Sequence, residues 1–283
     1  MPVWLNGRIV EEEAARIDPR DRGFLLGDGL FETMRAAGGR VPLLRRHLAR
    51  LRAAAMVLDL PVPLDEPALA QACRSLLALQ GLEDAALRLT LSRGCGPRGL
   101  LPPEQPAPVL LLVAFPLHPP REPARAALVE GTRRNEHAPT SRLKSLGYLD
   151  SILALQEARA AGAGEAILRN TAGRLACAAA ANLFVIDRGR LLTPGLEEGV
   201  LPGITRGLVL ELAPRIGVPV LEVPLEPERL ATAEGLLLTS SLAGIRPVVA
   251  LDGQPVGCGE PHRLGQHLQA LWQAQMGAAF SDF

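Results

Sequence analysis

Hydrophobic residues recur along the chain with two different spacings. A return every three or four positions predicts an amphipathic helix, whereas short apolar or alternating runs predict strands. The first spacing predicts helices at residues 43–58, 66–80, 148–161, 203–216 and 262–276. The second predicts strands at residues 3–5, 8–10, 30–35, 40–44, 86–92, 109–115, 126–133, 165–169, 175–178, 183–187, 191–192, 218–223 and 235–239. This mixture of helices and strands indicates an α+β fold.

Glycine-containing turns divide the first part of the chain. Asn6-Gly7 supplies the positive φ angles that a two-residue hairpin turn needs. A second hairpin is predicted across Ala37-Gly38-Gly39, with residues 30–35 pairing with residues 40–44. Three glycines within residues 21–33 predict backbone that packs closely against another segment.

Prolines cluster near the middle of the chain, at Pro116, Pro119, Pro120 and Pro123. We interpret the cluster as an interdomain linker, because proline interrupts both helices and strands. The predicted division is an N-terminal α/β domain at residues 1–117, a linker at residues 118–125 and a C-terminal domain at residues 126–283 that carries Lys144.

Composition argues against several classes of protein. The 30 basic and 30 acidic residues cancel, so nothing indicates a nucleic-acid or anionic membrane partner. No apolar run reaches the roughly 18 residues of a transmembrane helix, and the start lacks a signal-peptide pattern. The four cysteines form no CxxC pair, which argues for a reducing compartment and against a zinc or disulfide framework. We therefore expect a cytoplasmic protein that binds no metal.

Lys144 is the only lysine in the sequence, and the remaining Lys+Arg positions are all arginine. Lysine can lose its proton near neutral pH and attack a carbonyl group, whereas the arginine guanidinium stays charged. Residues 141–149 are therefore the prime candidate for chemistry. Lys144 is predicted to form a Schiff base, with a carbonyl substrate or with pyridoxal phosphate. The alternative is an ordinary surface lysine in a chain that otherwise uses arginine.

Three features are suited to binding a phosphate group. Gly203-Ile204-Thr205 opens a predicted helix, where free N–H groups and the helix dipole favour an anion. Ser240-Ser241 follows a strand and offers hydroxyls, and Arg50 could contact an anion at two points. Each feature alone is commonplace. Beside a unique lysine, however, the three fit a phosphorylated aldehyde, and pyridoxal phosphate is such a cofactor.

Several motifs occur in one order and spacing along most of the chain. They are residues 21–33, His47-Leu48-Ala49-Arg50-Leu51, Lys144-Ser145-Leu146-Gly147-Tyr148-Leu149, Asn182-Leu183-Phe184, Leu191-Leu192-Thr193 and Gly203-Ile204-Thr205-Arg206. Together they resemble the class IV, or fold type IV, pyridoxal-phosphate enzymes. That family contains branched-chain and D-amino-acid aminotransferases and 4-amino-4-deoxychorismate lyase.

The resemblance implies a two-domain fold type IV enzyme similar to D-amino-acid aminotransferase, with pyridoxal 5'-phosphate as its cofactor. Lys144 falls on the Schiff-base position. The positions expected to contact the cofactor, mostly at its phosphate, are Arg50, Tyr148, Ile204, Thr205, Ser240 and Ser241. The resemblance further implies a small-molecule amino substrate and a homodimer with the active site near the subunit interface.

One position departs from the family's pattern. In the family a glutamate five residues before the Asn182 position pairs with the pyridine nitrogen, and Cys177 stands there in this chain. A carboxylate keeps that nitrogen protonated, which a neutral thiol does poorly. Either the cysteine is tolerated and water takes this role, or the reaction demands less of the ring. Gly147, where the family has asparagine, is a milder departure.

The predicted reaction rests on residues 93–99, Arg-Gly-Cys-Gly-Pro-Arg-Gly, which resemble the RGxGxRG loop of the lyases. In D-amino-acid aminotransferases the arginine matching Arg98 helps to bind the substrate carboxylate. Their partnering tyrosine and histidine are replaced here by Phe31 and Leu100, which weakens that alternative. Phe31 and Arg98 are the expected substrate contacts.

We therefore favour an enzyme like 4-amino-4-deoxychorismate lyase, which releases pyruvate and 4-aminobenzoate for folate synthesis. One alternative is an aminotransferase for branched-chain or D-amino acids with a 2-oxo acid acceptor. Another, from a different class, is a pyridoxal-phosphate-binding protein with little turnover.

Overall fold

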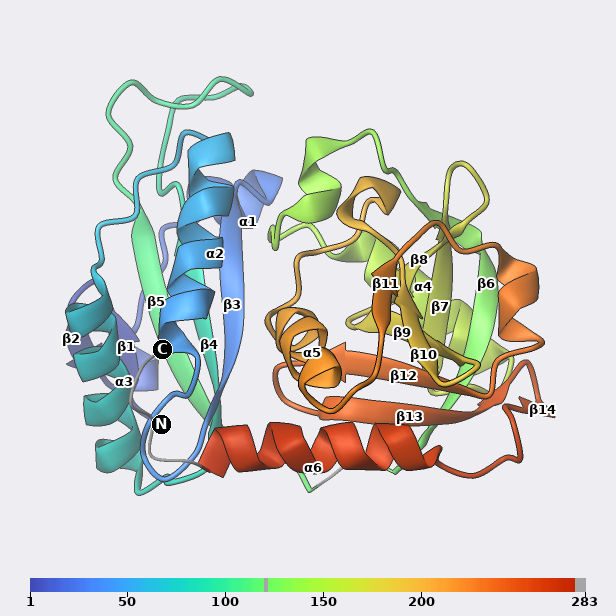
Figure 1. The fold of residues 1–283 in the computed structure, drawn as a ribbon. Helices are drawn as coiled ribbons and strands as arrows, with labels where there is room; N and C mark the ends of the chain where they lie inside the picture. The colour runs from blue at the N-terminus through green and yellow to red at the C-terminus, as the bar shows by residue number, and fades with distance from the viewer. Residues whose placement is uncertain (120–121, 278–283) are drawn as a thin grey trace. The chain divides into compact units, whose positions relative to one another are not determined.

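The computed structural model describes residues 1–119 and 122–277, which form two compact units (Figure 1). Unit 1 holds Met1–His118 and the separate segment Leu143–Gly147. Unit 2 holds Pro119–Arg142 and Tyr148–Met276. Residues 120 and 121 of the predicted linker lie outside the described residues, and the predicted domain boundaries stay a prediction.

Unit 1 contains an antiparallel five-stranded sheet in the order β2-β1-β5-β4-β3. Its strands are β1 (Val3–Leu5), β2 (Arg8–Val10), β3 (Gly29–Ala36), β4 (Ala85–Ser92) and β5 (Val109–Pro116). The predicted hairpin between β1 and β2 is confirmed, with Asn6 and Gly7 at φ angles of 48° and 90°. Asn-Gly is favoured in such turns because both residues tolerate positive φ.

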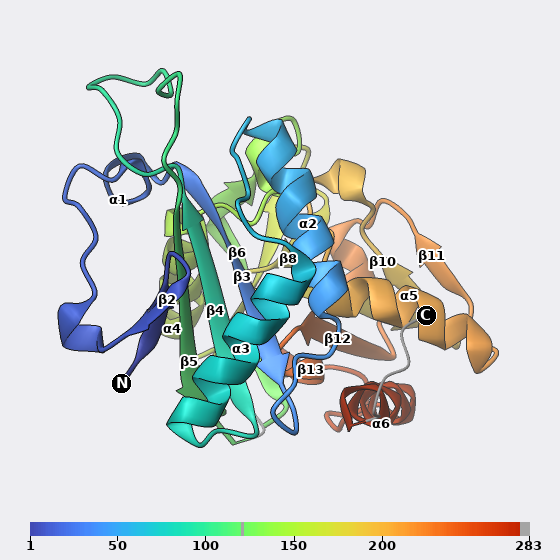
Figure 2. The same ribbon diagram turned by 90° about the vertical axis from the view of Figure 1, so that its left-hand side faces the viewer.

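Helices α2 (Leu44–Val57) and α3 (Glu66–Gln80) cover one face of this sheet (Figures 1 and 2). Both helices lie close to their predicted ranges. Asp65 caps α3 by accepting a hydrogen bond from the Ala68 N–H at 2.8 Å, and Gly81 ends it at a φ of 65°. The core between sheet and helices is built from alternate strand residues and one stripe of each helix, including Leu30, Met34, Leu51, Leu76, Leu87 and Leu89.

The second predicted hairpin is wrong. Residues 40–44 form no strand, and only Ala37 and Arg40 pair across the turn. Strand β3 instead pairs along its whole length with β4, which follows α3 in the chain. The long antiparallel pairing buries alternating leucines of β4, whereas residues 40–44 lead directly into α2.

The glycine-rich stretch before β3 contains a short helix, α1 (Arg22–Leu26), that the apolar pattern does not predict. Asp21 caps it, accepting from the Gly23 N–H at 2.8 Å. The predicted close packing is confirmed at Gly29, where an added Cβ would lie 2.4 Å from the Leu91 carbonyl oxygen.

Lys144 belongs to unit 1, which differs from the predicted placement within residues 126–283. The reason is backbone pairing along β3. The Phe31 N–H donates to the Lys144 carbonyl at 2.9 Å, and the Leu146 N–H donates to the Gly29 carbonyl at 3.0 Å. The lysine segment thus pairs with the edge of β3 at one isolated bridge, between Leu30 and Ser145.

Unit 2 contains a nine-stranded mixed sheet. Its strands are β6 (Ala124–Arg134), β7 (Glu165–Asn170), β8 (Leu175–Ala178), β9 (Asn182–Asp187), β10 (Arg190–Thr193), β11 (Val220–Glu222), β12 (Gly235–Ser240), β13 (Gly244–Leu251) and β14 (Gln254–Pro255). The order β9-β12-β13-β6-β7-β8 closes on itself, because β8 also pairs with β9 at Cys177 and Asn182. Strands β13 and β14 are absent from the prediction.

Three helices belong to unit 2, namely α4 (Leu149–Ala160), α5 (Ile204–Arg215) and α6 (Arg263–Gly277). Each begins and ends within two residues of its predicted range. Single 3-10 turns lie at Glu12–Ala14 in unit 1 and at Pro139–Arg142, Leu196–Glu198 and Pro227–Leu230 in unit 2. Among the described residues, every helix is too short or too polar to cross a membrane.

Candidate active site

Lys144 lies against an aromatic ring and near a second cation. Its Nζ is 4.3 Å from the centre of the Phe31 ring, and the Arg88 guanidinium carbon is 3.8 Å from the same centre. Phe31 comes from β3 and Arg88 from β4, where alternation places both side chains on the sheet face away from the leucine core. The predicted substrate contact Phe31 therefore adjoins the predicted catalytic amine.

The surroundings of Lys144 make its amine easier to deprotonate. Burial lowers the pKa of Lys144 from 10.5 to about 8, and the charges of Arg50 and Arg88 act in the same direction. Glu32 acts in the opposite direction. A buried ammonium loses its hydration, so the neutral amine is favoured. At this pKa roughly a tenth of the Lys144 amine is neutral at pH 7 and available as a nucleophile.

Arg50 lies in a buried cluster on the other face of β3. Its Nε and Nη2 donate to the two carboxylate oxygens of Glu32 at 2.8 and 2.6 Å. His47 Nδ1 lies 2.6 Å from the same carboxylate. Arg50 and His47 are one turn apart on α2, which explains why both reach Glu32. The predicted phosphate ligand Arg50 is therefore held by two parallel bonds.

The start of α5 in unit 2 has the features of an anion site. Within the part of the chain that the structure describes, no side chain caps this helix, and Gly203 precedes its first residue, Ile204. Thr205 is buried in the first turn. An added Cβ on Gly203 would lie 2.0 Å from Asn182 Oδ1, so glycine is required for the close approach. The uncapped N–H groups favour a negatively charged ligand.

Strand β12 brings further hydroxyls to unit 2. Thr239 lies opposite Asn182 in β9, and its buried Oγ1 has no hydrogen-bond partner among the described residues. Ser240 and Ser241 follow at the end of the strand, half-buried, and Ser240 Oγ accepts from the Ala243 N–H at 3.3 Å. An unsatisfied buried hydroxyl is uncommon in native proteins and often indicates a missing ligand or water.

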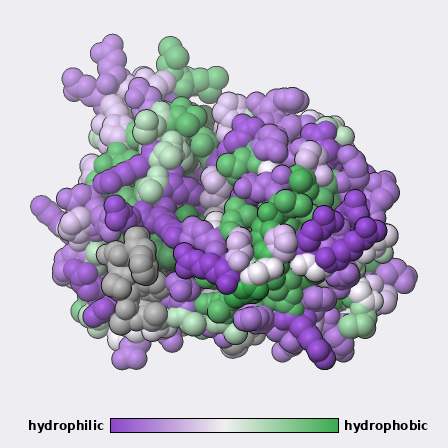
Figure 3. All heavy atoms as spheres, viewed as in Figure 1, coloured by the Kyte–Doolittle hydropathy of each residue, from purple (hydrophilic) through white to green (hydrophobic). Residues whose placement is uncertain are grey.

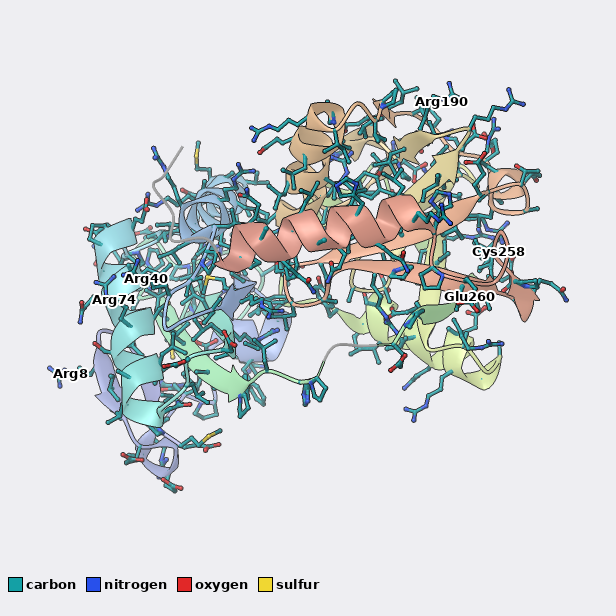
Figure 4. The ribbon with its side chains drawn as sticks, turned by 60° about the horizontal axis from the view of Figure 1, so that its bottom comes forward. Arg8, Arg40, Arg74, Arg190, Cys258 and Glu260 are labelled. Carbon is teal, nitrogen blue, oxygen red and sulfur yellow. The ribbon has the colours of Figure 1, made fainter. Side chains whose placement is uncertain are left out.

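Cys177 occupies the bridge that closes the ring of strands, opposite Asn182. Burial raises the pKa of the Cys177 thiol, and the nearby charge of Arg134 opposes this rise. The thiol is therefore neutral at physiological pH. By contrast, Cys258 is exposed, close to Glu260 in the segment before α6 (Figure 4).

Arg98 lies on the loop between β4 and β5 and is exposed. The next residues, Leu100 and Leu101, are each 83% exposed, and apolar atoms gather at the tip of this loop (Figure 3). The buried guanidinium of Arg22 anchors this loop. It donates hydrogen bonds to the carbonyls of Gly99, Leu100 and Leu101 at 2.8–3.3 Å. The predicted substrate contact Arg98 is therefore on an anchored but solvent-facing loop.

Tyr148, the remaining predicted cofactor contact, stands directly before α4 at the start of a unit 2 segment. Sequence reasoning missed Glu32, Arg88 and Thr239. For Arg88 a signal was present, since it alternates with the buried leucines of β4 and shares the opposite face with Thr90. Glu32 and Thr239 give no such signal, because buried polar residues within apolar strands are identified only by their partners.

The fold and the lysine environment define a pyridoxal-phosphate enzyme of fold type IV. The family model "Amino-transferase class IV" matches residues 29–251, so the chain belongs to the class IV aminotransferases. These enzymes depend on pyridoxal phosphate, and the predictions of family, fold and cofactor are confirmed.

Two relatives illustrate the range of the family. A provisionally named branched-chain-amino-acid aminotransferase from Methanocaldococcus jannaschii is 36% identical over 90% of this chain and 90% of its own length. The D-alanine aminotransferase of Bacillus licheniformis is 29% identical over 96% of both chains.

Solved structures give the same fold. The branched-chain amino acid aminotransferase of Escherichia coli superposes with a TM-score of 0.93 and 28% identity, covering 99% of this chain and 96% of its own. A provisionally named 4-amino-4-deoxychorismate lyase from Legionella pneumophila superposes with a TM-score of 0.87 and 30% identity, covering 93% and 97%.

The residues present fit the cofactor. In unit 1, an amine with a pKa of about 8 suits attachment of an aldehyde. In unit 2, taken by itself, the uncapped α5 start and the unsatisfied Thr239 hydroxyl suit a phosphate. The neutral Cys177 thiol and, to a lesser degree, Gly147 depart from the family pattern described above.

Proposed function

We propose that this protein is an aminotransferase that moves an amino group between a branched-chain or D-amino acid and a 2-oxo acid. The observation that carries the proposal is the Lys144 amine, lowered in pKa beside Phe31 and Arg88. The relatives named above support this alternative more than the lyase favoured by the sequence motifs. The expected substrates are small amino acids. The protein is expected to be a homodimer, as the resemblance implies, and to be cytoplasmic, as the composition indicates.

Lys144 has two tasks in this reaction. Its neutral amine would hold the cofactor at the aldehyde, and its Nζ would hold and move the proton that the substrate carbon exchanges. Pyridoxal phosphate supplies the aldehyde and the electron-accepting ring. Near pH 7 the amine is partly neutral, because its pKa is about 8 rather than 10.5.

Arg88 and Phe31 are proposed to orient the substrate. Stacking on the Phe31 ring fixes the plane of the Arg88 guanidinium, which can then bind a carboxylate at two points. The ring itself offers an apolar surface beside the amine for a hydrocarbon side chain. Arg98, on its exposed loop, remains a second candidate for the substrate carboxylate.

The remaining predicted contacts are proposed to hold the cofactor. Arg50 and the α5 start would bind its phosphate, through a guanidinium in one case and through uncapped N–H groups in the other. The further residues with this role are Tyr148, Ile204, Thr205, Ser240 and Ser241. Cys177 is proposed to face the pyridine nitrogen, where a neutral thiol would leave that nitrogen unprotonated.

A lyase acting on 4-amino-4-deoxychorismate is the second candidate. It is favoured by the Arg-Gly-Cys-Gly-Pro-Arg-Gly sequence of residues 93–99 and by the similarity to the Legionella protein. The neutral Cys177 also fits it, since releasing a leaving group demands less of the ring than full amino transfer. The two reactions differ in whether a 2-oxo acid acceptor is consumed.

The test is a panel of amino donors with 2-oxoglutarate, including the L and D forms of leucine, valine and alanine. Formation of glutamate supports the aminotransferase. Pyruvate release from aminodeoxychorismate without an acceptor would favour the lyase. Borohydride reduction should fix one cofactor on the peptide that contains Lys144, and Lys144→Arg should abolish both this label and turnover. A labelled and active Lys144→Arg variant would overturn the proposal.

A further inference from the structure

Unit 1 contains a buried carboxylate, Glu32, that is not itself a predicted contact of cofactor or substrate. The Glu32 side chain is 1% exposed and is shared between His47 and Arg50. Both Arg50 Nη2 and His47 Nδ1 lie 2.6 Å from Glu32 Oε2, and Arg50 Nε lies 2.8 Å from Oε1. Burying a charge is costly unless partners compensate it, so such a residue must be held by specific contacts.

The position of Glu32 in the strand links it to the lysine. Its neighbour Phe31 donates its N–H to the Lys144 carbonyl and presents its ring to the Lys144 amine. Successive residues of a strand project to opposite faces. One strand therefore contacts the amine through Phe31 and holds Arg50 through Glu32.

We propose that Glu32 is a positioning residue of the Lys144 site. Its carboxylate fixes the plane of the Arg50 guanidinium and offsets the positive charge that Arg50 and Arg88 place near the amine. The inference rests on the proposed function only in taking Lys144 as the amine that binds the cofactor.

The charges around Lys144 determine the direction in which its pKa should move when Glu32 loses its charge. Three elements carry them, with Glu32 on β3, Arg88 on β4, and His47 and Arg50 on α2. Burial lowers the pKa of His47, so the imidazole is neutral and adds no charge of its own near neutral pH. Glu32 is thus the anion that opposes the two arginines, and removing its charge should make the ammonium of Lys144 less stable.

The single lysine allows a direct measurement. Full-length protein without cofactor, labelled with [13Cε]lysine, gives one resonance for Lys144, whose shift follows protonation of the amine. We expect a midpoint at about pH 8 in the wild type. Glu32→Gln should move the midpoint to lower pH, and Arg88→Gln should move it to higher pH. His47→Gln, which keeps the Glu32–Arg50 pair, should shift it less than Glu32→Gln.

An unchanged or raised midpoint in folded Glu32→Gln would overturn the proposal, because a purely structural role leaves the titration of Lys144 alone. If Glu32→Gln does not fold, the same comparison is made between Arg50→Gln and Glu32→Gln/Arg50→Gln. Removing both buried charges is often tolerated, and the double variant should titrate at lower pH than Arg50→Gln. Borohydride labelling tests the proposed function separately, so failure of one does not decide the other.

Discussion

Phe31 and Glu32 are adjacent in strand β3, yet their side chains meet different parts of unit 1. The Phe31 ring lies 4.3 Å from the Lys144 amine, whereas the Glu32 carboxylate lies 2.6 Å from Arg50 Nη2 on α2. The strand thus connects the Lys144 amine to the predicted phosphate ligand Arg50 through two consecutive residues. Changes on either face are expected to affect the chemistry of Lys144.

Replacing Arg50 should weaken cofactor binding. A hydrogen bond to a charged group contributes about 1.5–3 kcal/mol, so Arg50→Gln should lower the affinity for pyridoxal phosphate roughly 10- to 100-fold. Titration of the cofactor absorbance measures this. Arg45→Gln, an exposed arginine on the same helix, is the matched control and should bind normally. Equal affinities in the two variants would remove Arg50 from the phosphate site.

Lys144 should destabilise the protein that contains no cofactor. Its pKa falls from 10.5 to about 8 on folding, which corresponds to roughly 3 kcal/mol when the amine is charged. Lys144→Met should therefore raise the free energy of unfolding by about 2–3 kcal/mol at pH 7, after the lost contact with Phe31 is subtracted.

The sign of the pH dependence follows from proton binding. Below pH 8 the Lys144 amine is protonated in both the folded and the unfolded state, so the full free-energy cost of burying the charged amine is present. Between about pH 8 and 10.5 the unfolded state binds more protons, so wild-type stability rises with pH. Denaturant unfolding of both proteins should show their difference shrinking across this range. A difference that does not change with pH would contradict a buried ammonium.

Cys177→Glu should protonate the cofactor's pyridine nitrogen, because a nearby negative charge favours the protonated form. The 15N resonance of ring-labelled cofactor should move accordingly, and amino transfer should accelerate relative to elimination. Cys177→Gln introduces a side chain of the same shape as glutamate but without its charge. This variant should behave like the wild type. The same 15N shift in both variants would show that Cys177 does not face the ring.

Arg22→Gln should release the loop between β4 and β5. Arg22 donates to three successive loop carbonyls and pairs with Asp28 at 2.8 Å. Losing these charge-assisted bonds should speed tryptic cleavage after Arg98 roughly tenfold or more. Arg20→Gln is the control, since Arg20 forms only an exposed pair with Asp18, and such pairs contribute little. Cleavage at equal rates would mean that the loop is held by other contacts.

The parts of the fold that depend on local signals could be predicted from the sequence. Helix α3 has its aspartate cap and terminal glycine, and its bounds match the prediction. The second hairpin was wrong because its local turn signal competes with the distant strand β4, which buries more apolar surface. Strand β13 contains Pro247, which argues against a strand inside a sheet, although it pairs there opposite Leu237.

The residues of the candidate site likewise divide into those that the sequence predicts and those that it does not. Lys144 stands out because it is the only lysine, and the motifs locate Arg50 and the start of α5. The role of Glu32 is identified only when the docking of α2 against β3 is known. The alternation of Arg88 with leucines is visible in the sequence, but its place beside Phe31 follows only from the register of β3 with β4. Such partners arise from pairings distant in sequence, which hydrophobic periodicity does not encode.

Strand β3 is the last strand in the unit 1 sheet, and the segment Leu143–Gly147 pairs along its outer edge. An uncovered strand edge is a template for pairing with other chains. The segment that carries Lys144 therefore also covers part of this strand edge, which we expect to reduce pairing with other chains. If the segment slipped by one residue along β3, Lys144 would point to the opposite face of the sheet. Coverage of the strand edge and correct placement of the lysine therefore depend on the same few hydrogen bonds. Selection for soluble expression alone should thus preserve the register of this segment.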